Sequence, residues 1–361
     1  EKRDWKGEYT LLDENPGYNP GYVDIVNATC PCAGLSSLSR TSSADSETND
    51  WMYTTAEYVL STIQPEVFWG ENAPRLYSKS GEPVANKLHE IAQRNGYTLN
   101  LYQTGSNLHG LAQKRPRTFY FFTKGENETP LFDYFRRDIE MSEDIFSKPP
   151  REGDPMDVVI ASHKDPYKNP WLRYCMYKAG VDTIYDYYQY INESTNCVTN
   201  SEKVSGDLNK VAEWMEENGF DPKFANRARA MQEKRDQGKG YWGHGITVPK
   251  GIIPSFIGVQ PTAMINPFRD SHVTFRDGLR LMKLPEDFDM VIDEEKGVPG
   301  TPNHMCQNVP VTTARDMMDT VLAYMNGECD KVNATLVKQS NNSMKHHVVS
   351  QEANDLDEFL T

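Results

Sequence analysis

The sequence predicts an α/β fold, in which helices pack on a central sheet. Short apolar or alternating segments, typical of buried strands, take turns with segments whose apolar residues recur at helical spacing. A strand–helix–strand order of this kind predicts a sheet with helices on its faces. The chain has 361 residues, of which 38% are hydrophobic. This is enough to form a hydrophobic core between such a sheet and its helices.

The elements follow one another along the first third of the chain. Residues 1–20 and 36–50 are rich in Gly, Pro, Ser or acidic residues and are predicted to form loops. The predicted strands are 22–28, 65–69 ending at Gly70-Glu71-Asn72, 97–103 and 118–123. The predicted helices are 51–63, 83–95, 275–283 and 311–326. Asn95-Gly96 is a suitable C-cap for the second of these helices.

The rest of the chain breaks this pattern. Residues 125–265 are rich in Pro, charged and aromatic residues, without regular alternation, and are predicted to form an inserted domain. The sequence thus predicts an α/β part over 1–124, an insert over 125–265 and a return to the first part over 266–330. Residues 331–361 form a polar tail that we expect to be disordered.

Composition limits the classes of partner. The net charge of −14 argues against a general nucleic-acid coat, because phosphate binding is largely an effect of Lys and Arg. A local basic surface remains compatible with DNA binding, as does a solvated mixed-charge helix face. The candidate cations are Lys203, Lys210, Lys223, Arg227, Arg229, Lys234, Arg235, Lys239 and Lys250.

The cysteine pattern and the hydropathy of the chain indicate the cellular compartment in which we expect the protein. The six Cys show neither CxxC pairs nor His partners at zinc-finger spacing, so we expect a reduced, intracellular protein without a zinc site. No apolar run approaches the ~18 residues of a membrane span, and no signal-peptide pattern opens the sequence. We therefore expect no membrane partner.

Several polar residues stand where the predicted strands end. Cys32 follows the first strand in a tight loop, the position at which open α/β sheets place their ligands. A single Cys is most often a buried small hydrophobe, so this position alone indicates little. Glu71 and Asn72 follow the second strand, where a plain strand-terminating turn is the alternative. Strand alternation puts Arg115 and Arg117 on one face, with a solvated basic turn as the alternative.

Four motifs in this order resemble the DNA cytosine-5 methyltransferase family. They are Pro31-Cys32-Ala33, Glu71-Asn72-Ala73-Pro74, Gln113-Lys114-Arg115-Pro116-Arg117 and Gln307-Asn308-Val309-Pro310. The approach Ser106-Asn107-Leu108-His109-Gly110 and the segment 269–288 also match, the latter as a helix and loop that support the recognition domain. The family usually has Gln at position 33, Val at 73 and Gly at 307.

The resemblance implies a Rossmann-like S-adenosylmethionine-dependent methyltransferase sheet with an inserted target-recognition domain over 125–265. It implies methyl transfer to carbon 5 of a cytosine flipped out of double-stranded DNA, as in restriction-modification systems. Cys32 would add to carbon 6, Glu71 would activate the ring, and Arg115 and Arg117 would position the base and charge. It further implies substrate contacts from Pro31, Ser36, Asn72 and Gln113, and S-adenosylmethionine contacts from Asn308 and Pro31.

One family feature is missing from the sequence. The Phe-x-Gly-x-Gly turn that binds the cofactor should precede Cys32 by some tens of residues, and the preceding residues do not contain it. We therefore expect a separate N-terminal fragment or subunit to complete the cofactor site. Two other readings stay open: a non-catalytic DNA-binding subunit, and a cytosine carbon-5 modifier that uses another one-carbon donor or an RNA substrate.

Overall fold

The computed structural model divides the chain into two compact units, which are described separately. It describes residues 20–32, 34–36, 43–125, 127–161, 165–239, 246–257, 261–293, 297–341 and 346–349. Unit 1 comprises residues up to Leu108, Pro116–Arg136 and the chain from Arg315 onward. Unit 2 comprises His109–Arg115 and Arg137–Ala314. None of the described helices is long and apolar enough to cross a membrane.

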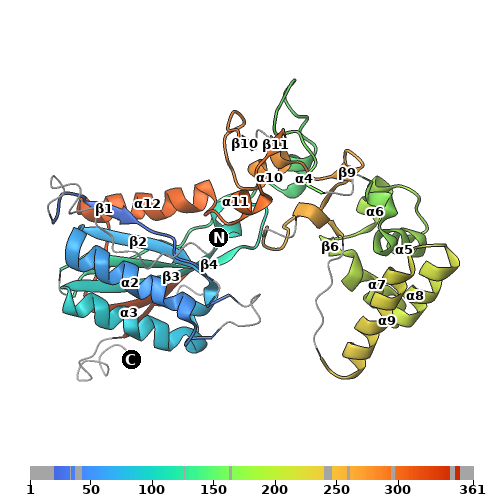
Figure 1. Ribbon diagram of the computed structural model, residues 1–361. Coiled ribbons are helices and arrows are strands. Elements are labelled where there is room, and N and C mark those ends of the chain that lie inside the picture. Colours follow the sequence, from blue (N-terminus) through green and yellow to red (C-terminus); the bar gives the residue numbers. More distant parts are fainter. Residues whose placement is uncertain are drawn as a thin grey trace. The chain divides into compact units, whose positions relative to one another are not determined.

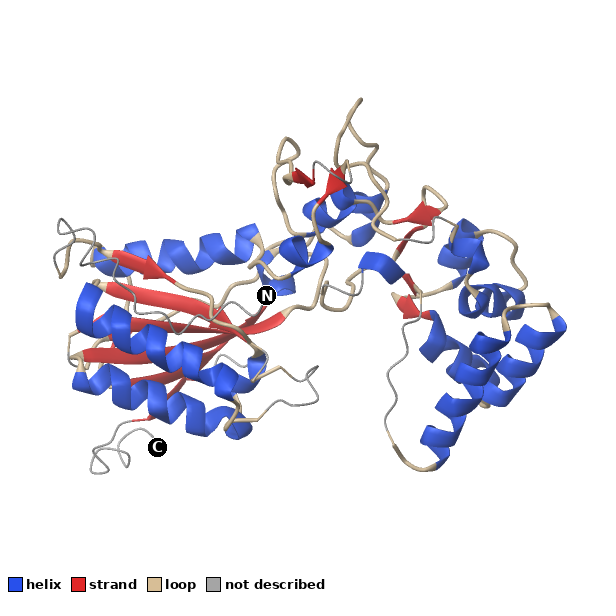
Figure 2. Cartoon of the chain, in the orientation of Figure 1, coloured by secondary structure: helices blue, strands red, loops and turns tan. Residues whose placement is uncertain are grey.

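Unit 1 is a six-stranded mixed sheet with helices packed on it (Figures 1 and 2). The strand order is β1-β2-β4-β3-β13-β14; β1–β2 and β3–β13 are parallel pairs and the other pairs are antiparallel. The strands are β1 Ile25–Asn27, β2 Val67–Asn72, β3 Tyr97–Gly105, β4 Pro116–Lys124, β13 Leu336–Ser340 and β14 His346–Val349. A small ladder pairs β5 (Thr129–Pro130) with β12 (Lys331–Val332).

Two helices cover one face of this sheet (Figure 1). Helix α2 (Asp50–Tyr58) continues into a π-helical turn, and α3 (Glu82–Arg94) ends where Gly96 takes a positive φ of 75°. Apolar residues at helical spacing, such as Val84, Leu88 and Ile91 in α3, pack on Phe68 and Phe122 of the sheet. The third helix of unit 1 is most of α12 (Val311–Met325).

Unit 2 is mainly helical and contains two hydrophobic clusters. One cluster joins α5 to α9, and the other joins α4, α10 and α11. The helices are α4 Ser142–Phe146, α5 Pro170–Ala179, α6 Ile184–Tyr190, α7 Cys197–Ser205, α8 Leu208–Glu217, α9 Pro222–Asp236, α10 Phe275–Leu281 and α11 Pro302–Cys306. Short antiparallel ladders pair β6 (Thr195–Asn196) with β7 (Thr247–Val248), β8 (Ile265–Asn266) with β9 (Ser271–His272), and β10 (Ile292–Asp293) with β11 (Val298–Pro299).

The structure confirms the predicted alternation and corrects the predicted tail. Every predicted strand and helix has a counterpart, with β2 extended so that it includes Glu71 and Asn72. The predicted loops 1–20 and 36–50 fall mostly on residues outside the described ones, but 47–49 form a 3-10 turn. The disorder predicted for 331–361 is wrong for 336–340 and 346–349. Strand β13 pairs with β3, and its buried Leu336 and Val337 explain why a polar segment joins the sheet.

The borders between the units differ from the predicted domain borders after 124 and 265. Residues 125–136 belong to unit 1, where β5 pairs with β12 and Phe132 stacks on Tyr102 at 4.6 Å between ring centroids. Residues 266–314 belong to unit 2, since Phe275 and Leu279 of α10 lie in the same cluster as Phe146 and Ile253. The sequence pattern indicates where the alternation of strands and helices stops. The border between the two units is set by packing between residues that are distant in sequence.

Candidate active site at the end of strands β1 and β2

Two parallel neighbouring strands present their carboxyl ends at one edge of the unit 1 sheet. Strands β1 and β2 pair in register Asn27↔Trp69, so both chains run the same way as they leave the sheet. The loop after β1 carries Pro31 and Cys32, and the end of β2 carries Glu71. Ligands of open α/β sheets bind at this edge, and the two candidate motifs therefore meet at one end of adjacent strands.

A glycine allows the β1 loop to lie close against β2. A Cβ atom at Gly70 would collide with the carbonyl oxygen of Ala28 and with the ring of Tyr120. The Tyr120 hydroxyl donates a hydrogen bond of 2.6 Å to that same carbonyl, and the amide of Ala28 donates to Trp69 O at 3.1 Å. These contacts set the path of the chain just before Pro31-Cys32.

The two cysteines of this loop lie in different environments. Cys30 is buried, with its Sγ 3.9 Å from the Tyr120 hydroxyl and from the carbonyl oxygen of Trp51, and burial raises the pKa of its thiol. Cys32 is exposed. A nucleophilic thiol must reach its substrate and ionise, so the structure favours Cys32 over Cys30 for that role. All six cysteines of the chain are described and are free.

The loop after Cys32 turns back onto helix α2. The amide of Leu35 donates to the carbonyl oxygen of Cys32 at 3.0 Å, which closes a tight turn. Gly34 has no room for a Cβ beside the Asn49 side chain, and Asn49 donates in turn to Ser43 O and Ala44 O. Pro31 is exposed and Ser36 is half-buried, so both predicted substrate contacts lie on this turn.

Glu71 forms an ion pair with Arg117, its neighbour across strands β2 and β4. The Nε of Arg117 contacts the Glu71 carboxylate, and the sheet register places Glu71 opposite Phe119, two residues further along β4. Only 6% of the Glu71 side chain and 20% of the Arg117 side chain is exposed. The guanidinium therefore holds the orientation of a largely buried carboxylate at the strand end.

Asn72 is turned into the core. Its Oδ1 accepts a hydrogen bond from the amide of Ala73 at 2.8 Å, and its Nδ2 lies 3.1 Å from the sulfur of Met52 in α2. Since the residue is fully buried, these contacts shape the turn after β2. The substrate contact expected of Asn72 remains a prediction.

The Gln-x-Arg-x-Arg motif is divided between the two units, Gln113 and Arg115 in unit 2 and Arg117 in unit 1. Gln113 is buried, accepts from the amide of Phe256 at 3.0 Å and donates to Leu281 O at 3.1 Å. These contacts are those of a residue that holds backbone segments together, and its substrate contact remains a prediction.

Arg115 is likewise buried among backbone carbonyl groups. Its Nη1 donates to Phe256 O at 2.9 Å and to Cys306 O at 2.7 Å, and its Nη2 donates to Gln307 O at 3.4 Å. β4 begins at Pro116, so Arg115 precedes the strand whose alternation was expected to pair it with Arg117. These contacts of Arg115 are with backbone carbonyl groups of unit 2, whereas Arg117 in unit 1 contacts the Glu71 carboxylate.

Asn308 lies just after α11, on the segment that Arg115 holds. It is exposed, and its Nδ2 donates to His304 O at 2.6 Å. Its side-chain oxygen accepts no hydrogen bond from the described residues, and the cofactor contact expected of Asn308 remains a prediction. Asn308 belongs to unit 2, whereas Pro31, the other predicted cofactor contact, belongs to unit 1.

The segment 269–288 forms a cross-linked support within unit 2. Helix α10 begins with a capping box between Thr274 and Asp277. From this helix the buried Arg276 pairs with Asp154 at 2.6 Å and with Asp289 at 2.6 Å. The pKa of Asp154 is lowered, chiefly by its hydrogen bond with Arg276. The helix expected over 275–283 is confirmed as α10, and all seven of its residues are buried. Its side chains bind residues 148–154, since Arg280 also donates to Lys148 O and Pro149 O at 3.0 Å.

Sequence reasoning missed the residues that hold the site together. In the sequence, Tyr120 is one more apolar residue of a predicted strand, and Gly70 stands where a predicted strand ends. The available signal was Gly70 itself, because a glycine inside a strand often marks a close backbone approach. Among the described residues, no cluster of His, Cys, Asp or Glu could hold a metal ion.

The family model for C-5 cytosine-specific DNA methylases matches residues 4–322, which is most of the chain. The chain belongs to this family. The match extends over both units, including the segments that carry Cys32, Glu71, Arg117 and Asn308. The resemblance drawn from the four motifs is thereby confirmed, as is a mixed α/β architecture around a central sheet.

Individual relatives are more distant. A Type II methyltransferase, M.AgeI of Thalassovita gelatinovora, is 29% identical over 110 residues, which cover 30% of this chain and 25% of the relative. The chain thus matches about a quarter of that relative's length.

Among solved structures, a prophage-encoded protein of E. coli assigned as a DNA modification methyltransferase has a TM-score of 0.49 and 15% identity, covering 88% of this chain and 82% of the other. The Entamoeba histolytica methyltransferase EhMeth has a TM-score of 0.46 and 7% identity, covering 84% and 78%. Both scores lie below 0.5, so the assignment rests on the family model.

Proposed function

We propose that this chain carries the base-activating part of a DNA cytosine-5 methyltransferase. The observation that carries the proposal is the ion pair of Glu71 with Arg117 at the end of β2, beside the parallel strand whose loop exposes Cys32. An exposed thiol and an oriented carboxylate at one sheet edge are the two groups that nucleophilic activation of cytosine requires.

In the proposed mechanism, the Cys32 thiolate forms a bond to carbon 6 of the cytosine ring. The electron pair of the 5,6 double bond then makes carbon 5 nucleophilic. Glu71 accepts a hydrogen bond from the exocyclic amine and, in its protonated form, donates one to ring nitrogen 3, which favours the attack. Arg117 holds the Glu71 carboxylate and binds the base oxygen. After carbon 5 has gained its methyl group, a base such as water takes its proton, and the electron pair of that C–H bond re-forms the 5,6 double bond. The bond between carbon 6 and the Cys32 sulfur breaks at the same time, which releases the thiolate.

S-adenosylmethionine, when bound, supplies an electrophilic methyl group. The residues proposed to contact it are Asn308, through its open amide oxygen, and Pro31, through its exposed ring. These two suit the polar and apolar parts of the cofactor. Among the described residues there is no glycine-rich turn after a strand that would approach its adenosine. We propose that a separate N-terminal fragment or subunit supplies those contacts.

The proposed substrate is cytosine in double-stranded DNA, inside a cell. The base must leave the stack, because a paired and stacked cytosine exposes neither face of its ring to a thiol. Gln113 and Arg115 enter the proposal as positioning residues, since their side chains hold the backbone of residues 256, 281, 306 and 307. Ser36 and Asn72 are proposed to shape the loops that face the base.

Two assays test the proposal, one for activation of the cytosine ring and one for the complete methyl transfer. Reversible addition of Cys32 to carbon 6 exchanges the hydrogen at carbon 5 with water, so duplex DNA with tritium at that carbon should release tritium without any methyl donor. Labelled methyl transfer from S-adenosylmethionine to mixed-sequence DNA then tests the whole reaction. Both signals should vanish in Cys32→Ala and persist in Lys114→Ala, an exposed residue between Gln113 and Arg115 to which no part in the mechanism is assigned.

The outcomes also separate the other readings. Tritium release without methyl transfer would support the base-activating half and indicate that the donor site is incomplete or takes another one-carbon donor. DNA binding without tritium release would overturn the proposal in favour of a non-catalytic DNA-binding subunit. Release from RNA alone would overturn the assignment of DNA as the substrate.

A further inference from the structure

Unit 2 contains two buried thiols that the proposed mechanism does not use. Cys175 lies in α5 and Cys197 is the first residue of α7, and no more than 1% of either residue is exposed. The Sγ of Cys175 lies 3.4 Å from the carbonyl oxygen of Cys197, and the two thiols hydrogen-bond to each other. The side chain of Cys175 therefore already spans the gap between the two helices.

Polar groups surround the sulfur of Cys175, which is unusual because a buried free cysteine normally packs like a small hydrophobe. The Oγ of Ser201 lies 3.2 Å from this sulfur, and the side chains of Asn200 and Tyr187 also hydrogen-bond to it. The Nδ2 of Asn200 in turn donates to the Tyr187 hydroxyl at 2.5 Å. Since these groups have hydrogens to donate, they stabilise a negatively charged sulfur.

This environment separates Cys175 from the other buried cysteines. Its pKa is lowered, chiefly by the hydrogen bond with Cys197. Burial instead raises the pKa of Cys30, Cys197 and Cys306. The thiolate is the nucleophile in thiol chemistry, and a fall of one unit in the pKa of a mostly protonated thiol raises its thiolate fraction roughly tenfold. The pair therefore combines a nucleophilic sulfur with a second, protonated sulfur beside it.

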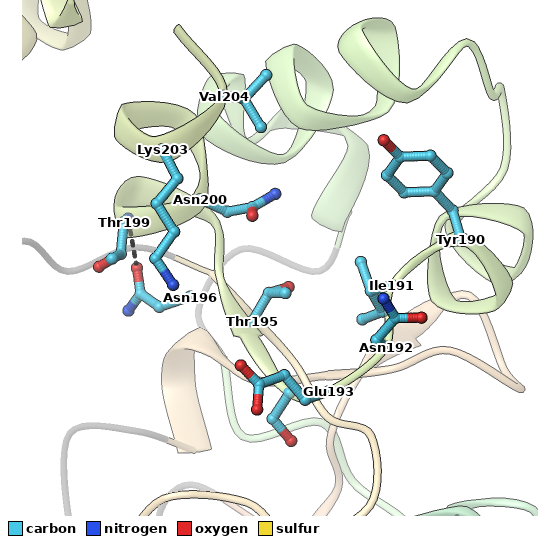
Figure 3. A pocket seen from close by; sticks show the side chains of 11 residues that line it. Tyr190, Ile191, Asn192, Glu193, Thr195, Asn196, Thr199, Asn200, Lys203 and Val204 are labelled. Carbon is cyan, nitrogen blue, oxygen red and sulfur yellow. Dashed lines mark hydrogen bonds between the residues drawn. The ribbon is translucent and has the colours of Figure 1, made fainter. Parts of the chain in front are cut away.

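A polar recess gives small molecules an approach to this pair. It has a volume of about 620 Å³ and lies between the end of α6 and the first turns of α7. Figure 3 shows Asn200 and Lys203 of α7 on its wall, with Tyr190 of α6 across from them. Asn200 thus contacts both the recess and the sulfur of Cys175. A small polar molecule that displaces the Asn200 amide would reach this sulfur.

We propose that Cys175 and Cys197 are a redox-active dithiol, which a hydroperoxide converts into a disulfide between α5 and α7. With hydrogen peroxide, the Cys175 thiolate attacks one oxygen, the O–O bond breaks, and a sulfenic acid and hydroxide form. The Cys197 sulfur then gives up its proton and attacks the Cys175 sulfur, whose hydroxyl group leaves as water. In total the two thiols lose two protons and two electrons, and two water molecules form.

The proposed disulfide is a modification that does not depend on methyl transfer. In reducing compartments, disulfides are usually transient and either catalytic or redox-sensing. The free thiols of Cys175 and Cys197 are the reduced form of such a pair. A small thiol reductant would restore this form by thiol–disulfide exchange.

Peroxide titration of the full chain, followed by peptide mass spectrometry, tests this proposal. Remaining thiols are alkylated in denaturant, and the protein is digested without a reductant. A peptide pair joined through Cys175 and Cys197 should appear, and dithiothreitol should remove it. Cys175 should be oxidised about tenfold or more faster than Cys306, a buried thiol whose pKa is raised.

Three variants separate the roles of the two sulfurs. Cys197→Ser should stop the reaction at the sulfenic acid of Cys175, which dimedone traps as a thioether. Tyr187→Phe should slow the oxidation of Cys175 roughly 5-fold, since it removes one hydrogen bond to the thiolate. Cys329→Ser is the matched control, because Cys329 is half-buried in unit 1, and it should form the disulfide as wild type does.

Three results would overturn the proposal. If Cys175 and Cys197 stayed free after Cys32 and Cys329 had reacted, oxidation of the pair would be excluded. A linked peptide that forms only in denaturant would show that the two thiols do not meet in the folded protein. Dimedone labelling of Cys175 in wild type without any disulfide would exclude Cys197 as the second sulfur. None of these measurements uses DNA, so their outcome is separate from that of the tritium and methyl-transfer assays.

Discussion

The hydroxyl of Tyr120 donates a hydrogen bond of 2.6 Å to the carbonyl oxygen of Ala28, four residues before Cys32. This bond joins the central strand β4 to the loop after the edge strand β1, across Gly70 of β2. The residue is fully buried and its hydroxyl also lies 3.9 Å from the thiol of Cys30. The position of the exposed thiol thus depends on a side chain that has no part in the chemistry.

Tyr120→Phe is predicted to slow the reaction at carbon 5 by freeing the loop that carries Cys32. One lost hydrogen bond should lower the free energy of unfolding by about 1 kcal/mol. Tyr102→Phe is the control, because Tyr102 makes a similar bond to Asp133 O at 3.1 Å elsewhere in unit 1. Urea unfolding should show similar losses for the two variants, whereas only Tyr120→Phe should slow tritium release. Equal release rates would contradict this role.

Gly70→Ala is predicted to damage both stability and activity. The added methyl group would collide with Ala28 O and the Tyr120 ring, and overpacking of this kind costs about 1–3 kcal/mol. Gly300→Ala is the control, since a Cβ there has its nearest neighbour at an ordinary 3.7 Å. Circular dichroism during urea unfolding measures the loss, and tritium release measures the displaced loop. Wild-type stability in Gly70→Ala would show that the loop moves aside freely.

Glu71→Gln is predicted to lower the rate of tritium release by about 10²- to 10⁴-fold, the usual contribution of general acid–base catalysis. The amide keeps the size of the carboxyl group and loses the charge that pairs with Arg117. Glu66→Gln is a suitable control, because Glu66 lies just before β2 and pairs with Lys124 at the surface. A rate within a fewfold of wild type would remove Glu71 from the mechanism.

The two loop cysteines should differ in their response to pH. Burial raises the pKa of Cys30 above its ordinary value of 9.0, so the folded state holds this proton more tightly than the unfolded chain does. The free energy of unfolding should therefore fall as pH rises through 9, by at most about 1.4 kcal/mol per pH unit. Cys30→Ala should make this decline shallower than in wild type, as measured by urea unfolding between pH 7 and 10. If the free energy of unfolding declined equally with pH in wild type and Cys30→Ala, the raised pKa of the buried Cys30 thiol would be contradicted.

Iodoacetamide labelling followed by peptide mass spectrometry provides a check on the same cysteines. Exposed Cys32 should be alkylated well before Cys30 at pH 7.5, because the reagent needs access and thiolate. Alkylation at Cys32 should abolish tritium release. Faster labelling of Cys30 would contradict the environments described for the pair.

Arg115→Lys is predicted to loosen helix α11 and the segment before Asn308. A lysine ammonium lacks the planar fork that reaches Phe256 O, Cys306 O and Gln307 O together. Backbone hydrogen exchange of residues 303–307 should accelerate about tenfold, as the loss of a charged buried hydrogen bond implies. Lys114→Ala, the exposed neighbour, should leave that exchange unchanged. Wild-type exchange rates in Arg115→Lys would show that the contacts with these carbonyl groups are dispensable.

The sequence by itself determined the family and the order of the strands and helices of unit 1 up to β4, together with helix α12. Local patterns suffice for this, because periodicity reflects burial within one element and the motifs lie in strand-end loops. The same reasoning places Cys32 and Glu71 at the ends of two predicted strands, and the structure shows that these strands are neighbours in the sheet. The predicted disorder of the tail failed because β13 gains its burial from β3, more than 200 residues away.

Only the tertiary structure decided what the individual side chains do. Arg115 and Arg117 are equivalent in the motif, yet one is buried among backbone carbonyl groups and the other pairs with Glu71. Cys30 and Cys32 are separated by one residue, and the contacts of Tyr120 bury the first while the second stays exposed. Such differences depend on partners that are distant in sequence, and spacing along the chain carries no information about them.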